Sequence, residues 1–337
     1  MARAHRTALH VSFWIALSIG ATSASATSPG SAVGTPGGTL ARALAEEVPL
    51  EELPGLTIDV GCLTGDGWRS VELYGDGLGF WGERAQIRVS RERIGRLLEA
   101  FRTSGFAEWP EAFGRTPAGP KTPAPPEQAG QPARLICQVR LAVGGEAKEV
   151  RQFDKGEVSE PLRRLAYEVL ATGEEAAAGG VTVESLPEGL RKALAGELDP
   201  RALELHVHRR SGGSDRSEGA GWLLRARGLE ADLQRYDPSG GLGPAESHRL
   251  GPEAFEGIVR NLVEHGMATL PPNLWAAEYT DLRVSVLGFS KDVQARQFAG
   301  MTATTHGERQ ADFTALFDAL QDLYRELASS EPGRGAG

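Results

Sequence analysis

The sequence predicts an α+β protein composed of two tandem repeats, each an antiparallel sheet of about five strands packed on helices. Some segments carry apolar residues at helical spacing, whereas others alternate apolar and polar residues as half-buried strands do. Short turns separate the alternating segments, which favours antiparallel pairing. The same order, βββαββα after a short leading helix, is expected in both halves of the chain. The helices are therefore expected to cover one face of each sheet.

The first 26 residues have the pattern of a cleavable signal peptide. Arg3 and Arg6 give a positive start, residues 8–19 are mostly apolar, and Ala24-Ser25-Ala26 is a small-residue cleavage pattern. The apolar stretch is shorter than the roughly 20 residues that span a bilayer, and an uncleaved anchor helix is the alternative. We expect cleavage near Ala26 and a periplasmic or extracellular protein. Residues 27–38, rich in Ser, Gly, Pro and Thr, are predicted to form a flexible leader.

The first repeat is predicted over residues 39–172. Gly75-Asp76-Gly77 supplies a tight turn between two of its strands. A Pro-rich stretch over residues 114–133 is predicted to be an extended surface loop. In order, the predicted elements are a helix at 40–44, strands at 56–60, 69–74 and 78–83, a helix at 94–101, a strand at 135–143, a strand ending at Phe153, and a helix at 162–169.

The second repeat is predicted over residues 186–328, between a linker at 173–185 and a disordered tail at 329–337. Its elements are expected in the same order. They are a helix at 190–194, strands at 203–207, 222–227 and 230–236, a helix at 255–262, a strand at 282–286, a strand ending at Phe298, and a helix at 313–320.

One helix carries the strongest internal match. Ile94, Leu97, Leu98 and Phe101 recur 161 positions later, and the closing Gly105 recurs as well. The next predicted strands of the two halves also match each other, at a spacing of 147 residues. The corresponding apolar residues of the second helix are Phe255, Ile258, Val259 and Leu262, and the two strands begin at Leu135 and Leu282.

The formal net charge of −9 argues against broad nucleic-acid binding, which needs a basic face. It also argues against a polybasic membrane anchor. After the predicted signal peptide, no stretch of the sequence is long and apolar enough to predict a transmembrane segment.

Several short motifs resemble a group of bacterial exported domains of unknown function. They are Gly61-Cys62, the strand and turn at residues 70–77, and Phe80-Trp81-Gly82. The resemblance covers residues 55–170 and, more faintly, 203–327. It implies an exported α+β domain and no assigned activity. The group also has a second Cys and a Pro-Tyr where Gly65-Asp66-Gly67-Trp68 stands here, so the role of that Cys pair does not carry over.

Cys62 and Cys137 are the two cysteines of the chain. Cys137 has the parity of the inward residues of its strand, and Cys62 has the parity of Ile58 and Val60. If the strands are neighbours, a cross-strand disulfide is sterically possible, and export permits it. Two buried free thiols are the alternative. A catalytic Cys is not expected, because an inward strand position lacks a base and exposure.

His206 and His208 share one strand face and are the nearest approach to a metal site. A metal needs at least a third ligand, and no accompanying metal-binding motif is present. We predict that both are solvated, that no metal or other cofactor is bound, and that the chain is not an enzyme. Neither a Gly-x-Ser-x-Gly elbow nor a phosphate loop occurs, so no catalytic residue is assigned.

The tripeptides at 151–153 and 296–298 are both Arg-Gln-Phe. We predict that Phe153 and Phe298 lie in the core, whereas the alternative makes Arg151 and Arg296 equivalent ligand contacts. The Trp residues after the predicted signal peptide are expected to anchor the core or loops rather than to form a sugar platform. They are Trp68, Trp81, Trp109, Trp222 and Trp275.

These observations predict a non-catalytic exported protein, acting as a binding or structural module of the periplasm or cell envelope through a protein or envelope partner. One alternative is a hydrolase with its site in the groove between the repeats. Polar residues of both repeats that converge there with hydrogen-bond geometry would favour it. Another alternative is a secreted inhibitor or interaction module, which would expose an apolar patch.

Overall fold

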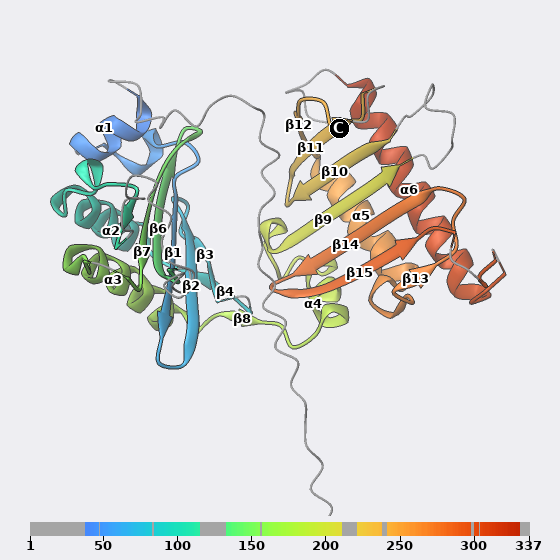
Figure 1. The fold of residues 1–337 in the computed structure, drawn as a ribbon, viewed down its shortest axis with the longest axis horizontal. Coiled ribbons are helices and arrows are strands. Elements are labelled where there is room, and N and C mark those ends of the chain that lie inside the picture. The colour runs from blue at the N-terminus through green and yellow to red at the C-terminus, as the bar shows by residue number, and fades with distance from the viewer. Residues whose placement is uncertain are drawn as a thin grey trace, which may run out of the picture.

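The computed structural model describes residues 38–46, 48–82, 84–114, 133–155, 157–210, 221–237, 241–297, 300–302 and 304–330. These residues form an α+β structure with two separate sheets, of eight and seven strands (Figure 1). The predicted signal peptide, the leader up to residue 37, most of the Pro-rich stretch and the tail from residue 331 lie outside the described residues.

The first unit, residues 38–182, contains the eight-stranded sheet in the order β5-β7-β6-β1-β2-β3-β4-β8. Its helices cover one face of this sheet. The elements are α1 (Thr39–Ala45), β1 (Thr57–Thr64), β2 (Gly67–Tyr74), β3 (Leu78–Trp81), β4 (Ala85–Arg88), α2 (Arg91–Thr103), β5 (Ala112–Phe113), β6 (Leu135–Val143), β7 (Glu146–Phe153), α3 (Glu160–Ala177) and β8 (Val181–Thr182).

The second unit, residues 183–330, contains the seven-stranded sheet in the order β12-β11-β10-β9-β14-β15-β13. Read from its other edge, this order matches that of the first sheet from β5 to β4. The elements are α4 (Leu186–Leu194), β9 (Leu203–Arg210), β10 (Trp222–Arg227), β11 (Glu230–Arg235), β12 (Glu246–Arg249), α5 (Pro252–Glu264), β13 (Asn273–Leu274), β14 (Tyr279–Val286), β15 (Phe289–Ala295) and α6 (Glu308–Ser329).

The helices α2 and α5 show how the local sequence fixes these elements. Ser90 caps α2 by accepting a hydrogen bond from Arg93 N at 3.2 Å, and Pro252 occupies the first position of α5. Gly105 and Gly266 follow with positive φ angles of 75° and 60°, which suit glycine at a helix end. The bounds of both helices lie 161 residues apart, as the apolar pattern predicts.

The expected number of strands is too low, and the sheets are not wholly antiparallel. The additional strands β4, β5, β8, β12 and β13 have two to four residues each, and β5 and β13 pair in parallel with β7 and β15. Segments this short do not show a measurable alternation of apolar and polar residues. The segment predicted as a linker contains the end of α3 and the edge strand β8.

The pairing of the strands shifts the predicted correspondence between the halves. Val60 on β1 lies opposite Val139, and Val207 on β9 lies opposite Leu282. Val139 therefore corresponds to Leu282, at a spacing of 143 rather than 147. An even shift of four residues keeps every side chain on the same face, so alternation alone does not detect it.

The shared Arg-Gln-Phe tripeptides do not occupy equivalent positions. Val150 and Val293 face the corresponding residues of β6 and β14, so Arg151 corresponds to Gln294. Arg296 follows β15, and Phe298 lies outside the described residues. The prediction that Phe153 is a core residue is wrong. It is half-buried, and Gln152 is the fully buried residue, whose side chain bonds the backbone of Phe153, Glu157 and Ser159.

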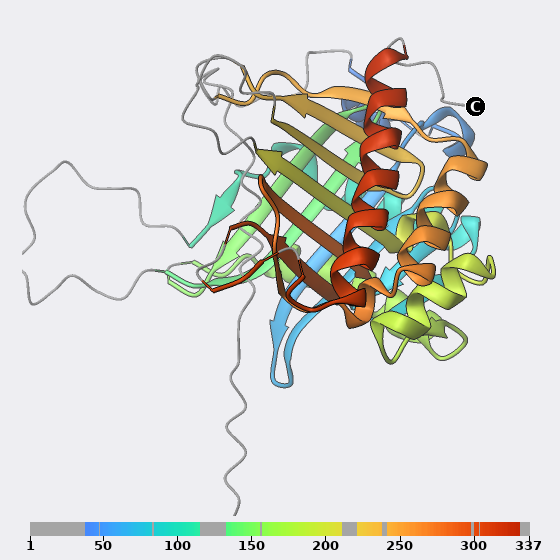
Figure 2. The ribbon, with the colours of Figure 1, turned by 90° about the vertical axis from the view of Figure 1, so that its right-hand side faces the viewer.

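The four layers run helices, sheet, sheet, helices. Figure 1 shows α1, α2 and α3 on the side of the first sheet away from the second unit. Figure 2 shows α5 and α6 in front of the second sheet, with the first sheet behind it. The two faces without helices therefore look toward each other. None of the helices in the described ranges is long and apolar enough to cross a membrane.

Candidate functional site

The opposed, helix-free faces of the two sheets, here called the facing surfaces, carry most of the charged and aromatic strand residues. Strand register shows which residues belong to each facing surface, because directly paired residues point to the same side of a sheet. In the first unit they include Asp59, Gly61, Trp68, Ser70, Glu72, Tyr74, Gln138, Arg140, Glu149 and Arg151. In the second they include Glu204, His206, His208, Arg225, Arg227, Asp281, Arg283 and Asp292.

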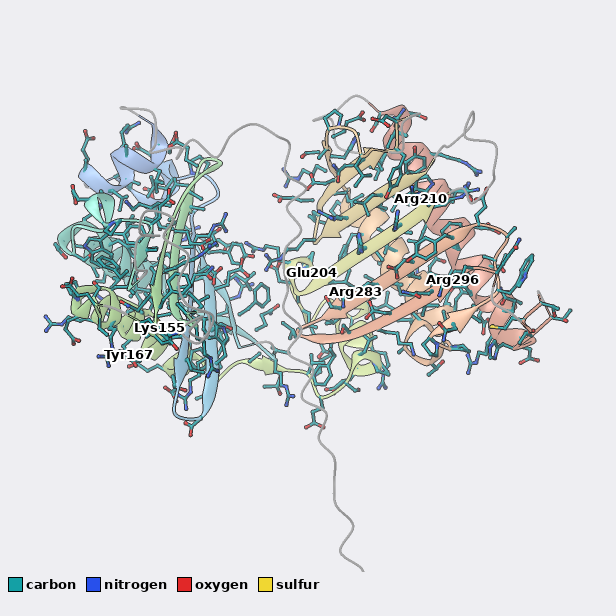
Figure 3. All side chains as sticks on the ribbon, viewed as in Figure 1. Lys155, Tyr167, Glu204, Arg210, Arg283 and Arg296 are labelled. Atoms are coloured by element: carbon teal, nitrogen blue, oxygen red, sulfur yellow. A yellow bond between two sulfur atoms is a disulfide. The ribbon has the colours of Figure 1, made fainter. Side chains whose placement is uncertain are left out.

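One arginine joins the two facing surfaces. Arg227 on β10 donates to both carboxylate oxygens of Glu72 on β2, with Nη1 at 3.2 Å from Oε1. Tyr74 donates its hydroxyl to the same Oε1 at 2.9 Å. Glu204 lies 3.5 Å from Arg227 Nε and forms the second ion pair of this guanidinium. Figure 3 shows Glu204 on the side of the second unit that is nearest the first.

A second ionic contact centres on Arg201, which precedes β9. Its Nη2 lies 2.6 Å from an oxygen of Asp76 in the first unit, and its Nε lies 2.9 Å from Asp199. The guanidinium also lies 4.4 Å from the centre of the Tyr74 ring, which is a cation–π geometry. Asp199 N donates to the side chain of Gln86 at 2.6 Å.

Apolar side chains complete the contact between the units. Leu78 and Phe80 lie on the helix-free side of β3, yet both are buried and belong to the apolar cluster that contains Leu186 and Leu190 of α4. Two cavities flank the contact. One of about 410 Å³ lies between β4 and the segment after α4, and one of about 270 Å³ lies between residues 50–56 and Arg201.

Asp59 is the carboxyl group of the first facing surface whose proton affinity departs furthest from the ordinary. Burial, together with the nearby carboxylates of Glu72 and Glu149, raises the pKa of Asp59 from 3.8 to about 6, against the opposite effect of Arg140 and Arg227. Asp59 and Glu72 are directly paired on β1 and β2. A proton is therefore available to this carboxyl pair near pH 6.

His206 and His208 lie on the second facing surface, as their parity predicts, but they are half-buried rather than solvated. Burial, together with the positive charges of Arg225 and Arg283, lowers the pKa of His206 from 6.5 to about 4. Burial also lowers the pKa of His208, whose Nε2 lies 2.7 Å from the Tyr236 hydroxyl. A ring of Tyr279 packs against the edge of the same imidazole.

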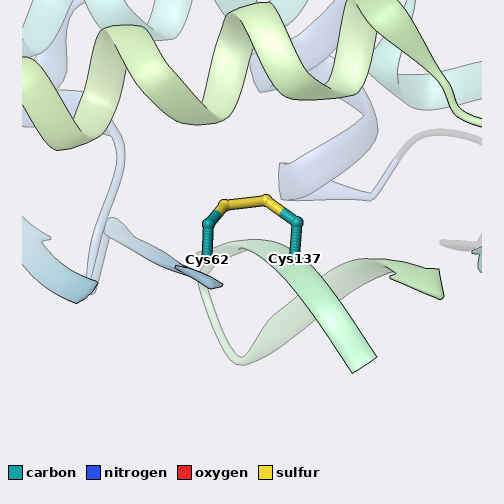
Figure 4. The surroundings of a disulfide bond; sticks show 2 residues. All are labelled: Cys62 and Cys137. Atoms are coloured by element: carbon teal, nitrogen blue, oxygen red, sulfur yellow. A yellow bond between two sulfur atoms is a disulfide. The ribbon is translucent and has the colours of Figure 1, made fainter. Parts of the chain in front are cut away.

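Cys62 and Cys137 form a disulfide between β1 and β6 (Figure 4). The two residues are directly opposite, with Cα atoms 4.0 Å apart, and both are buried on the helix-covered side. In the second unit, Arg209 and Thr280 form the corresponding pair. The bond is therefore a feature of the first sheet only.

Trp68 departs from the expectation that the Trp residues are anchors. Its side chain is 48% exposed on the first facing surface, and a Cβ added at Gly61 would lie 2.5 Å from its ring. The indole thus lies against the backbone of Gly61, with its other side open to solvent. Trp222, in contrast, is buried and stacks on Tyr324 and Phe317.

No group of three or more His, Cys, Asp or Glu side chains suitable for a metal ion occurs among the residues that the structure places. Polar residues of both units do converge with hydrogen-bond geometry, at Tyr74, Glu72 and Arg227. Such a convergence is what a hydrolase with its site between the units requires. His248 was missed by the sequence analysis. It is buried beside Ser330, and its Nε2 has no hydrogen-bond partner within the described ranges.

Comparison with known proteins returns no family model that matches the chain, and no curated protein matches it.

Proposed function

We propose that this chain is an exported, non-catalytic binding protein of the periplasm or cell envelope, and that the facing surfaces hold its partner. The observation that carries the proposal is the set of polar and aromatic side chains on the opposed sheet faces, with Trp68 exposed among them. Antiparallel sheets commonly pack one face on the core and leave the other face in water. Here the two such faces lie opposite each other, and Arg227 links them to Glu72.

We also propose that the two units are diverged tandem repeats and that the chain belongs with the exported domains of unknown function that it resembles. The matching strand orders and the coincident bounds of α2 and α5 support the repeat. A signal peptide at residues 1–26 accounts for export. A disulfide buried in the first sheet fits an oxidising compartment.

The residues that differ between the units support binding rather than a shared structural role. The disulfide and Trp68 belong to the first unit. The His206–His208 pair belongs to the second unit, and Asp59 and Gly61 hold the corresponding positions in the first. If the faces served only to hold the units together, the exposed members would not need to include an indole fixed on Gly61. An exposed aromatic ring held in one place is a typical anchor of a binding surface.

Site-specific photo-crosslinking in intact cells tests the proposal. A photoreactive amino acid is placed at Gln138 or Asp281 on the facing surfaces, and at Glu168 of α3 or Asp322 of α6 as controls. We expect one reproducible partner band from the facing positions and none from the helices. Crosslinks confined to the helices, or none from any position, would contradict the proposal.

A hydrolase acting between the units is a second candidate, favoured by the Asp59–Glu72 pair. The raised pKa of Asp59 lets it hold a proton near pH 6 beside a second carboxyl group that is paired with Arg227, as an acid–base pair requires. The candidate predicts hydrolysis of a chromogenic ester, glycoside or peptide that Asp59→Asn abolishes while photo-crosslinking is retained. If no substrate of such a panel is hydrolysed in a way that depends on Asp59, the hydrolase candidate is ruled out.

A further inference from the structure

We propose that the second facing surface contains a binding site for an oxyanion, formed by Arg225, His206 and Arg283. This inference rests on the proposed binding function and deepens it by naming the chemical class of the ligand. Phosphate, sulfate and carboxylate groups share the required chemistry, which is a compact group of anionic oxygen acceptors.

Strand register brings the three side chains into one row. His206 on β9 lies directly opposite Arg225 on β10 and directly opposite Arg283 on β14. Side chains that are directly paired across antiparallel strands have Cβ atoms about 5 Å apart. The row therefore places an imidazole between two guanidinium groups on the side that faces the first unit. Figure 3 shows Arg283 at this position on β14.

His206 supplies a hydrogen-bonding group that the protein leaves unused. Its Nε2 is buried, and no described residue bonds it. A buried polar atom without a partner costs about 1–3 kcal/mol, so such atoms are uncommon unless a ligand or water completes them. An acceptor oxygen placed over this row would accept a hydrogen bond from Nε2–H.

The two arginines retain donors for the same ligand. Arg225 is exposed and makes no hydrogen bond or ion pair with any residue in the described part of the chain. Arg283 binds Asp292 through Nε at 2.7 Å and Nη2 at 3.3 Å, which leaves its Nη1 outside that pair. Asp292 holds the guanidinium in a fixed orientation and leaves one edge of it available.

The electrostatics of the row fit an anion. Arg225, His208 and Arg283 all disfavour the charged form of His206, and Asp292 opposes them. Asp281 and Glu204 are the other carboxylates on the strands β14 and β9 that carry the row. An oxyanion at the row would relieve the repulsion and favour imidazolium. Binding should therefore tighten as the pH falls from about 6 toward 4.

The test follows the His206 imidazole by NMR during titration of the full mature chain with inorganic phosphate, sulfate or acetate, at constant ionic strength. We expect saturable shifts of the His206 signals and a higher His206 pKa in the bound state. Sulfate is the probe for the pH dependence, because its charge is constant over this range. Tighter binding of phosphate than of acetate would indicate a phosphoryl ligand, and the reverse a carboxylate; either supports the site.

Two variants and one control locate the site. Arg225→Gln and Arg283→Gln should each weaken binding by about tenfold, the loss expected for one charge-assisted contact. Arg260→Gln changes an exposed arginine of α5, on the far side of the second sheet, and should leave binding unchanged. Absence of a His206 response to all three anions, or equal affinities for all variants, would overturn the site.

The outcome is separable from that of the proposed function. A failed anion titration with intact photo-crosslinking from Gln138 and Asp281 removes only the oxyanion site. Loss of the crosslinks removes the binding surface as a whole, whatever the His206 signals do.

Discussion

Asp59 and Glu72 are directly paired on β1 and β2, and the two carboxyl groups differ in the hydrogen-bond donors that stabilise their negative charge. Glu72 accepts hydrogen bonds from Arg227 and Tyr74, whereas no hydrogen bond to Asp59 is formed by the residues that the structure describes. Burial therefore acts on Asp59 with little compensation, and its pKa rises to about 6.

This difference predicts how stability depends on pH. The unfolded chain loses the Asp59 proton near pH 4, and the folded chain loses it near pH 6. Between these values the folded state binds more protons, so stability falls as the pH rises. Asp59→Asn should be more stable than the wild type by about 2 kcal/mol at about pH 8 and equally stable at about pH 3. Urea unfolding of both proteins at both pH values measures the two stability differences. An equal difference between variant and wild type at the two pH values would contradict the prediction.

His206 predicts the opposite dependence. Its pKa of about 4 lies below the ordinary value of 6.5, so the unfolded chain binds the proton first as the pH falls. Stability from the neutral imidazole is present above pH 6.5 and is lost as the pH falls toward 4. Without added anion, the wild type should lose about 2 kcal/mol more stability than His206→Gln when the pH falls from about 7 to about 4, as measured by urea unfolding. The same difference in unfolding free energy between variant and wild type at both pH values would refute this dependence.

The pair of Arg227 and Glu72 should couple the two units. Their side chains are 43% and 23% exposed, so we expect a coupling free energy of about 1 kcal/mol. A double-mutant cycle with Arg227→Gln and Glu72→Gln measures it at low and high salt, and screening should reduce it. The exposed pair Arg260 and Glu256 within α5 serves as the control, with about 0.3 kcal/mol expected. A coupling no larger than the control would show that the pair does not hold the units together.

The disulfide should contribute substantially to the stability of the first unit. It joins residues 75 positions apart, and closing a loop of this length stabilises a fold by about 2–4 kcal/mol. Reduction should lower the urea midpoint of the wild type and leave that of a Cys62→Ala/Cys137→Ala double variant unchanged. A wild-type midpoint that is insensitive to complete reduction would count against this contribution.

The sequence predicts well what depends on local pattern. Helix α2 follows from the spacing of Ile94 and Phe101 and from the Gly105 stop, and the faces of β1 and β9 follow from alternation. Strand register does not follow, because a period of two is unchanged by the shift of four that separates Leu282 from Val286. The short edge strands are missed because two to four residues carry no period.

The site depends on relations that no single segment contains. The pairing of Arg227 with Glu72 arises from the way α4 and β8 bring the two sheets face to face, and 155 positions separate the two residues. Parity places Cys62 and Cys137 on the inward side but leaves the bond between them open. The exposure of Trp68 follows from its place near the β1–β2 turn over Gly61, and an aromatic residue in a strand pattern reads equally well as core.

Hydroxyl-radical footprinting of the protein, with and without an extract of the cell envelope, tests whether the facing surfaces bind a partner. Trp68 on the first facing surface and Tyr167 on α3 are nearly equally exposed, at 48% and 44%, and Figure 3 shows Tyr167 on the side away from the second unit. We expect the extract to protect Trp68 together with Tyr236 and Tyr279, while Tyr167 reacts as before. Protection of Tyr167 with unchanged reactivity of Trp68 would contradict it.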